Sequence, residues 1–414
     1  MVLIGAGASM PYLPDTEELT RRLVAWPGFL EPVGPMNPSN PLAGVTASHG
    51  PGGSRRTYFG ALAKVGGSDL NFEGLIDLAD ELAHYLANQA SRDPTYWWRA
   101  RALFDLRPEF AAWEQHQFAL RHVPERARVF ILREVATAAA GLRAIPSIVP
   151  ALERLAGVAD LRVHSLNYDD LPFSANLAWI TGFAPDGRFE LTTDWKLAQH
   201  TLVQMHGSVR WATTGSEMTF FRSSVRAGRE WDGTVGMSAA RAYQDGRIAP
   251  HSPMITGLRK TDAILSEPYG TYFQLFRQEL LSTNRWLIVG YGFGDPHVNA
   301  TLRSAWASWR QQLGYAKKGL RVLIVAWASD ADLQKDGGMA GAGTVLQERL
   351  RVLSVCPEGS DSERHRDRLQ FSPYRFERGT LKQLRGDLAL SFDGTSGVFS
   401  DRPLEQSVRE FLFG

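Results

Sequence analysis

Four turns in this chain carry residue types that can bind or attack a ligand. Their sequences are GAGAS (5–9), HSLNYDD (164–170), QMHGS (204–208) and GYGFGDPH (290–297). A short apolar run precedes or opens each of them, which is typical of a buried strand. In open parallel sheets, ligands bind at the carboxyl ends of the strands. We therefore expect the four turns to meet at one edge of a sheet.

The first turn has the composition of a phosphate-binding loop. Gly5 and Gly7 allow backbone N–H groups to approach a pyrophosphate, and a helix start nearby favours negative charge. The third glycine of dinucleotide-binding fingerprints is missing, because Met10 and Pro11 occupy that region. The alternative is a tight strand-to-helix turn that holds no ligand.

The second and third turns supply candidate catalytic groups. Asn167 can orient a water molecule or a sugar hydroxyl, since its amide both donates and accepts. His206 is placed for general-base work near neutral pH. His164 competes with it, although strand alternation points His164 away from Asn167. Each of these residues also has a purely structural interpretation, as a turn or hydrogen-bonding residue.

The fourth turn combines backbone freedom with a carboxylate. Its glycines, among them Gly290 and Gly292, permit close contact between backbone and ligand. Asp295 can cap the helix that Pro296 opens, or accept a hydrogen bond from a ribose hydroxyl. Both roles are compatible.

The elements that must position these turns alternate between short apolar strands and helices. This pattern predicts an α/β fold with a doubly wound parallel sheet. Strands are expected at 2–4, 161–163, 202–205, 286–289, 321–325 and 351–355. Helices are expected at 14–24, 72–86, 110–120, 123–142, 147–155, 269–281 and 296–312. The Pro- and Gly-rich residues 31–56 predict a loop.

Composition excludes several classes of protein. Hydrophobic residues make up 44% and charged residues 21%, as in ordinary globular proteins. The 45 Lys and Arg balance the 44 Asp and Glu, so total charge gives no argument for nucleic-acid or membrane binding. A single cysteine, Cys356, and scattered histidines argue against a disulfide framework or a metal site. No apolar run approaches the ~20 residues that span a bilayer, and we expect a cytoplasmic protein.

The order of the four motifs resembles the bacterial sirtuin-like family. GAGAS, LNYDD, MHGSV and LIVGYGFGDPH carry the resemblance, together with NFEGLIDL (71–78), and it covers most of residues 1–330. It implies a sirtuin-like Rossmann core at 1–68 and 157–330 with a helical insertion at 69–156. Residues 331–414 form a C-terminal extension to which the resemblance assigns no role.

The resemblance also implies roles for individual residues. The residues that match the family's catalytic positions are Asn167, Asp169 and His206. Those that match its NAD-binding positions, or lie in the same turns, are Gly5, Ala6, Gly7, Ser9, Pro14, Asp15, Gly290, Tyr291, Gly292 and Asp295. Two departures stand out: Thr16-Glu17 replaces the Phe-Arg of deacylating sirtuins, and Tyr291 replaces a threonine.

A missing module favours one reaction within the family. Deacylating sirtuins hold a small domain with a four-cysteine zinc site after the His-Gly motif, and this chain has no cysteine between His206 and Gly290. Without a groove for an acyl-lysine peptide, water becomes the expected nucleophile. The resemblance thus implies an NAD+ hydrolase that releases nicotinamide and ADP-ribose and needs no metal. The alternatives are an NAD-dependent deacylase or ADP-ribosyltransferase, and a non-catalytic sensor of NAD or ADP-ribose.

The resemblance further implies partners. Sirtuin-like NADases act in antiphage defence and are gated by homo-oligomerisation or by a partner such as a HerA-type ATPase or a short Argonaute. The helical insertion, with Trp97 and Trp98, is a candidate assembly surface, although these aromatics can equally be core residues.

Overall fold

The computed structural model describes most of the predicted core. The described residues are 1–26, 57–66, 70–87, 123–191, 194–214, 217–222, 254–256, 264–312, 319–327, 379–385 and 388–414. The predicted loop at 31–56, the helix at 110–120, the strand at 351–355, and Trp97 and Trp98 lie outside them.

A seven-stranded sheet forms the centre of the described part of the chain, in the order β3-β2-β1-β6-β7-β9-β8. All neighbours pair in parallel except β8, which runs antiparallel at the edge. A separate hairpin consists of β4 and β5. The strands are β1 (Val2–Ile4), β2 (Leu161–Ser165), β3 (His200–Gln204), β4 (Trp211–Thr214), β5 (Glu217–Phe220), β6 (Arg285–Val289), β7 (Arg321–Val325), β8 (Lys382–Arg385) and β9 (Leu388–Ser391).

The strand order defines a Rossmann-like α/β fold. Numbered along the chain, the six parallel strands follow the order 3-2-1-4-5-6, which is that of dinucleotide-binding sheets. β1 pairs with β2 on one side and with β6 on the other. The direction of winding reverses between β1 and β6, so the carboxyl ends of these two strands mark the switch point at which such sheets bind ligands.

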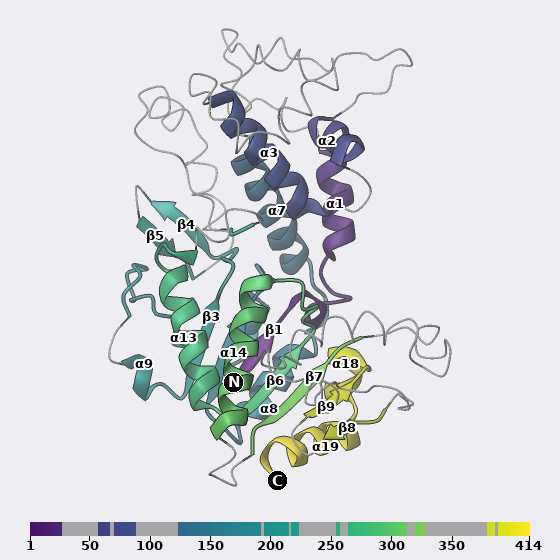
Figure 1. The fold of residues 1–414 in the computed structure, drawn as a ribbon, viewed down its shortest axis with the longest axis vertical. Helices are drawn as coiled ribbons and strands as arrows, with labels where there is room; N and C mark the ends of the chain where they lie inside the picture. The colour runs from purple at the N-terminus through teal and green to yellow at the C-terminus, as the bar shows by residue number, and fades with distance from the viewer. Residues whose placement is uncertain are drawn as a thin grey trace, which may run out of the picture.

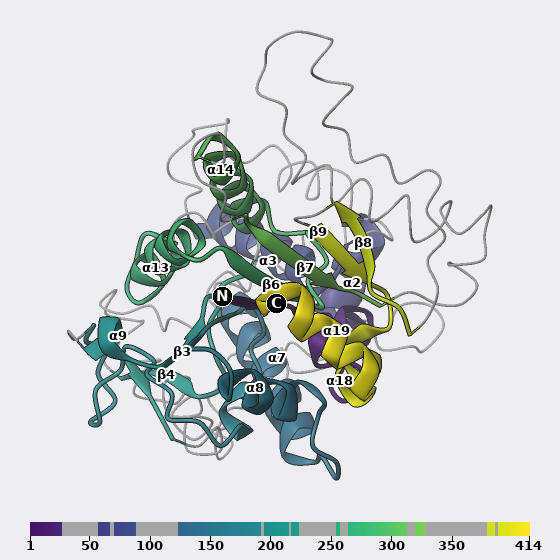
Figure 2. The same ribbon diagram turned by 90° about the horizontal axis from the view of Figure 1, so that it is seen from below.

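Helices cover both faces of the sheet (Figure 2), because its strands are apolar on both sides. Leu3 packs on one face with α13 and α14, whereas Val2 and Ile4 pack on the other face with α8, α18 and α19. The helices are η1 (Ala6–Ala8), α1 (Thr16–Ala25), α2 (Tyr58–Gly66), α3 (Phe72–Ala87), α7 (Val123–Ala140), α8 (Ile148–Ala156), η3 (Leu171–Ser174), α9 (Asp194–Leu197), α13 (Tyr269–Ser282), α14 (Pro296–Gln312), α18 (Gly394–Ser400) and α19 (Arg402–Phe413).

The sheet extends beyond residue 330, where the resemblance ended. β9 pairs in parallel with β7, and β8 pairs with β9. α18 and α19 bury Val398, Leu404 and Val408 against the same face as α8. The described part of the C-terminal extension therefore completes the Rossmann-like layer.

A second group of helices, which we call the helical layer, consists of α1, α2, α3 and α7. It lies above the sheet in Figure 1 and shares a separate apolar core. Turn residues beyond the strand ends, among them Tyr168 and Val209, pack into that core, so the helical layer covers the carboxyl edge of the sheet. The expected insertion at 69–156 differs from this layer at both ends: α1 and α2 belong to the layer, while α8 packs on the sheet.

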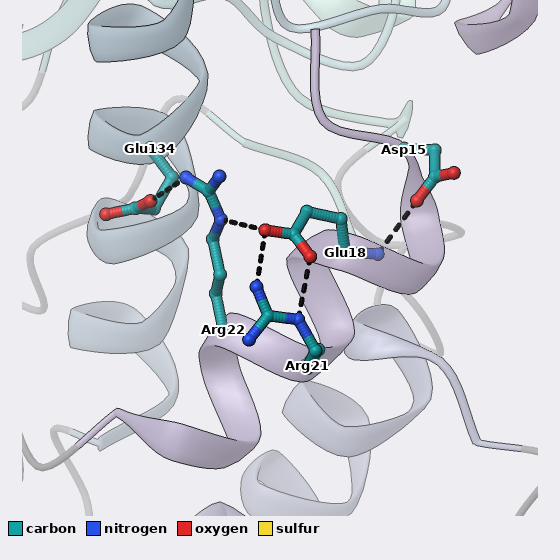
Figure 3. Close-up of polar contacts among 5 residues, drawn as sticks. All are labelled: Asp15, Glu18, Arg21, Arg22 and Glu134. Carbon is teal, nitrogen blue, oxygen red and sulfur yellow. Dashed lines mark hydrogen bonds and ion pairs between the residues drawn. The ribbon is translucent and has the colours of Figure 1, made fainter.

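Ion pairs fix α1 within the helical layer (Figure 3). Asp15 caps the helix, since its Oδ1 accepts from the N–H of Glu18 at 2.8 Å. Glu18 pairs with Arg21 and Arg22 at 2.7 Å on the same helix. Arg22 also reaches Glu134 of α7 at 2.5 Å, which joins the two helices.

The main elements expected from periodicity are confirmed wherever the structure describes them. Five predicted strands correspond to β1, β2, β3, β6 and β7, and the helix predictions near 14–24, 72–86, 123–142, 147–155, 269–281 and 296–312 correspond to α1, α3, α7, α8, α13 and α14. β9 was not predicted. Among the described residues, no helix has the length and apolar content needed to cross a membrane.

Candidate functional site

Two glycine turns pack against each other at the switch point. Gly290 has φ of +62°, and a Cβ there would lie 2.0 Å from the backbone nitrogen of Ala8. A Cβ on Gly5 would lie 2.6 Å from Cα of Tyr291. Glycine is therefore required at both positions by the close approach of the two turns, before any ligand is considered.

The N–H groups of the first turn have partners within the chain. Gly5 N–H donates to Val289 O and Gly7 N–H donates to Gly290 O, each at 2.9 Å. These two N–H groups therefore donate within the chain, and a contact of Gly5 or Gly7 with NAD stays a prediction. Ala6, between them, is exposed at the edge of the sheet.

Three predicted residues form one hydrogen-bonded cluster at the ends of β1 and β2. The Asn167 amide nitrogen lies 3.2 Å from Gly5 O and 2.9 Å from Ser9 Oγ. Ser9 Oγ in turn donates to Asp169 Oδ2 at 2.8 Å. All three side chains are buried. The two turns thereby bring together groups that are 158 and 160 residues apart.

The hydrogen-bond partners of Asn167 fix the orientation of its amide group. Gly5 O can only accept, so the amide nitrogen of Asn167 must face it and the amide oxygen must face elsewhere. Asn167 Oδ1 is buried and has no hydrogen-bond partner within the described residues. A buried amide oxygen without a partner costs free energy, and it fits a ligand or water that supplies a donor.

Asp169 sits at the end of the cluster in a low-dielectric environment. Burial raises its pKa to about 6, although the hydrogen bonds from Ser9 and from the N–H of Leu171 oppose the shift. Its backbone carbonyl accepts from the side-chain nitrogen of Gln204 at 2.8 Å. Asp169 is therefore held on both its side chain and its main chain, which suits an orienting role.

His206 lies beside this cluster at the end of β3. Ser165 of β2 pairs with Gln204 of β3. Asn167 lies two residues after Ser165, and His206 lies two residues after Gln204. Nε2 of His206 lies 3.1 Å from Oδ2 of Asp295, although it makes no hydrogen bond of acceptable geometry to any described residue. β3 and β6 are not neighbours, so this contact spans the carboxyl ends of β1 and β2.

Asp295 serves two structural purposes at once. Its Oδ1 accepts from the N–H groups of His297 and Val298 at 2.9 and 3.2 Å and caps α14, while its Oδ2 faces His206. The capping interpretation from the sequence is confirmed. A ribose contact by Asp295 stays a prediction.

His164 does not belong to the cluster. Its ring lies against Phe276, and its Nε2 is paired with Glu279 of α13. The expectation that strand alternation directs it away from Asn167 agrees with this placement.

Several predicted binding residues lie apart from the cluster. Asp15 is the cap of α1 and Pro14 precedes it. The hydroxyl of Tyr291 turns inward to Asn299 Oδ1 at 2.8 Å, and its pKa is raised by burial and by Asp295. Gly292 is exposed on the loop before α14.

Two further residues beyond strand ends on the same edge were not predicted as site residues. Trp327 lies two residues after the end of β7 and is 66% exposed. Val325, the last residue of β7, accepts a hydrogen bond from the N–H of Gly290 at 2.8 Å, which places this strand end next to the Gly290 turn. Thr395 follows β9, is buried, and its hydroxyl has no partner in the described ranges. The signal for Trp327 was available, since it follows the apolar run RVLIV as the other turns follow theirs.

Comparisons with known proteins add no assignment. No protein-family model matches the chain, and no curated protein matches it. No group of three or more His, Cys, Asp or Glu that could hold a metal ion occurs in the part of the chain that the structure describes.

Proposed function

We propose that the chain hydrolyses NAD+ at the bond between nicotinamide and ribose. The observation that carries this proposal is the buried Asn167, whose amide oxygen has no partner among the described residues. Asn167 follows β2 as His206 follows the neighbouring strand β3, at the carboxyl edge of a Rossmann-like sheet. Sheets of this strand order bind dinucleotides at this place. The resemblance of the four turns to sirtuin-like proteins supports the same substrate.

The chemistry needs little beyond positioning and a base. Nicotinamide is cationic in NAD+, so it leaves with the bonding electron pair and needs no acid. Water attacks C1′ of the ribose, the C1′–N bond breaks, and the proton of the water passes to His206. Asn167 Oδ1 accepts a hydrogen bond from the water or a ribose hydroxyl, and its fixed orientation lowers the entropic cost of that arrangement. Asp169 acts through Ser9, which holds Asn167.

The adenosine half of the substrate extends along the same edge, over the ends of β6 and β7. The exposed loop residues Gly292 and Gly294 leave room for it, and a Cβ on Gly294 would meet no heavy atom of the described structure within 4 Å. The exposed ring of Trp327 offers a face on which adenine can stack.

Regulation is part of the proposal, because a free NADase depletes the cofactor of its own cell. A homo-oligomer or a protein partner, such as a HerA-type ATPase or a short Argonaute, would switch the activity during phage infection. The helical layer is the proposed docking element, since it covers the carboxyl edge of the sheet.

Substitution of the two central residues tests the assignment. Nicotinamide release is measured for Asn167→Ala and His206→Ala, with His200→Ala as the matched control at the opposite end of the same strand, β3. We expect loss of release in the first two variants and retention in the control, with all proteins folded. Full activity in both variants would overturn the assignment. Deacylation of an acyl-lysine peptide with little other NAD loss would favour the deacylase, and binding without consumption would favour the sensor.

A further inference from the structure

A three-residue segment, Met254–Thr256, lies between the helical layer and the His206 turn. Met254 forms an isolated antiparallel bridge with Gly207. The N–H of Ile255 donates to His206 O at 2.9 Å, and Ile255 O accepts from the Tyr168 hydroxyl at 3.0 Å. The segment therefore holds the backbone of His206 and the side chain next to Asn167 in the chain.

The third residue of this segment is bound by a buried arginine of α7. Nε of Arg128 donates to Oγ1 of Thr256 at 2.9 Å, and both side chains are buried. The other nitrogens of the guanidinium bind Glu125, at 2.6 Å, and Asp80 of α3. Burial opposes the charge, but Glu125 and Asp80 outweigh it and raise the pKa of Arg128, which stays cationic.

We propose that Arg128 is a positioning residue for His206. This inference rests on the proposed function. The guanidinium is planar and fixed by three partners, so it places Thr256 at one angle and distance relative to α3 and α7. The N–H of Ile255 donates to His206 O, so the position of the segment fixes the position of the His206 backbone. In this way a rigid ion cluster of the helical layer sets the location of the catalytic base over the sheet.

A second link runs in parallel with the first. The hydroxyl of Tyr168 also lies 3.4 Å from Oε1 of Glu73, which belongs to the first turn of α3. Tyr168 stays protonated, because burial and the nearby Glu73 raise its pKa well above the usual value. Both links connect α3 to the same three-residue segment, and a displacement of α3 or α7 by a partner would therefore reach His206.

The Arg128–Thr256 hydrogen bond can be removed without removing the contacts that pack α3 against α7. The contact with Asp80 joins α7 to α3, the contact with Glu125 lies within α7, and neither needs Thr256. The hydrogen bond to Thr256 does not link α3 to α7. It links α7 to the Met254–Thr256 segment. Thr256→Val removes the acceptor while keeping the shape of the side chain, and Thr256→Ser keeps the acceptor.

The test measures two properties of each variant: kcat for nicotinamide release, and the NMR ring signals of His206. For Thr256→Val we expect kcat for nicotinamide release to fall by about tenfold or more, with KM unchanged, because small misplacements of a catalytic group are costly. The ring signals of His206 in the NMR spectrum of isotope-labelled histidine, assigned with His206→Ala, should move. Thr256→Ser should restore both properties. Arg22→Gln, which breaks the ion pair between α1 and α7 in Figure 3, is the matched control and should change neither.

Arg128→Lys provides a second variant, since it keeps a cation between Asp80 and Glu125 but lacks the guanidinium Nε. Wild-type kcat and an unmoved His206 signal in folded Thr256→Val or Arg128→Lys would overturn the inference. If the wild-type protein releases no nicotinamide, the proposed function fails, and the His206 signal alone then decides whether Arg128 positions that residue.

Discussion

The ionisation of Asp169 makes stability depend on pH in a window that the structure defines. Burial raises the pKa of Asp169 to about 6, against 3.8 for the unperturbed group. The folded protein therefore holds this proton over a range in which the unfolded chain has released it. Stability is highest below the unfolded pKa and declines as the pH rises through the folded one.

The size of the effect follows from the shift. A displacement of about two pKa units, at about 1.4 kcal/mol per unit, corresponds to a loss of about 3 kcal/mol between roughly pH 4 and pH 7. Asp169→Asn removes the titration. It also costs one hydrogen bond, because Ser9 and the N–H of Leu171 donate to different carboxylate oxygens and an amide keeps only one of these acceptors. That cost is about 1 kcal/mol and does not vary with pH.

The assay is chemical unfolding of wild type and Asp169→Asn at a series of pH values. Subtracting the two free energies of unfolding cancels the titration of the groups that they share. We expect the wild type to lose about 3 kcal/mol relative to the variant as the pH rises from 4 to 7. A difference that is constant across this window would refute the reasoning about burial of Asp169.

Packing, capping and stacking give three more predictions. Gly290→Ala should cost about 3 kcal/mol of unfolding free energy, since its φ of +62° and the 2.0 Å approach to a backbone nitrogen both oppose a Cβ. Gly294→Ala should stay within about 0.5 kcal/mol, and equal losses in the two variants would contradict the account. Asp15→Ala should cost about 1 kcal/mol in thermal or chemical unfolding and Asp15→Asn much less, because asparagine caps equally well; equal losses would remove the cap as the cause. Trp327→Ala should raise KM for NAD about tenfold without changing KM for nicotinamide mononucleotide, which lacks adenine; an equal change for both substrates would exclude stacking on adenine.

Local sequence predicted the fold because each central strand is a short apolar run that ends at a polar or glycine-rich turn. The run WLIV before Gly290 and the run VLI before Gly5 needed no knowledge of partners. Parallel pairing then brings such turns to one edge, which is why Ser9, Asn167 and Asp169 meet as the spacing implied.

Other features depend on contacts that no local pattern encodes. The contact of His206 with Asp295 arises because turns from non-adjacent strands fold over the sheet. The role of Thr256 depends on Arg128, which is 128 residues away. β9 is only four residues long, and it is a strand because β7 offers it an edge. The glycines of the first turn were predicted as turn residues, and the close approach of the Gly290–Tyr291 backbone, which requires glycine at position 5, has no signal in the local sequence.

The most direct test of the central claim is a time course of purified protein with NAD+, followed by NMR without any acceptor peptide. We expect nicotinamide and ADP-ribose to appear in equal amounts as NAD+ disappears, and Asn167→Ala to halt this conversion. NAD+ that binds and stays intact, with no nicotinamide or ADP-ribose formed, would contradict this.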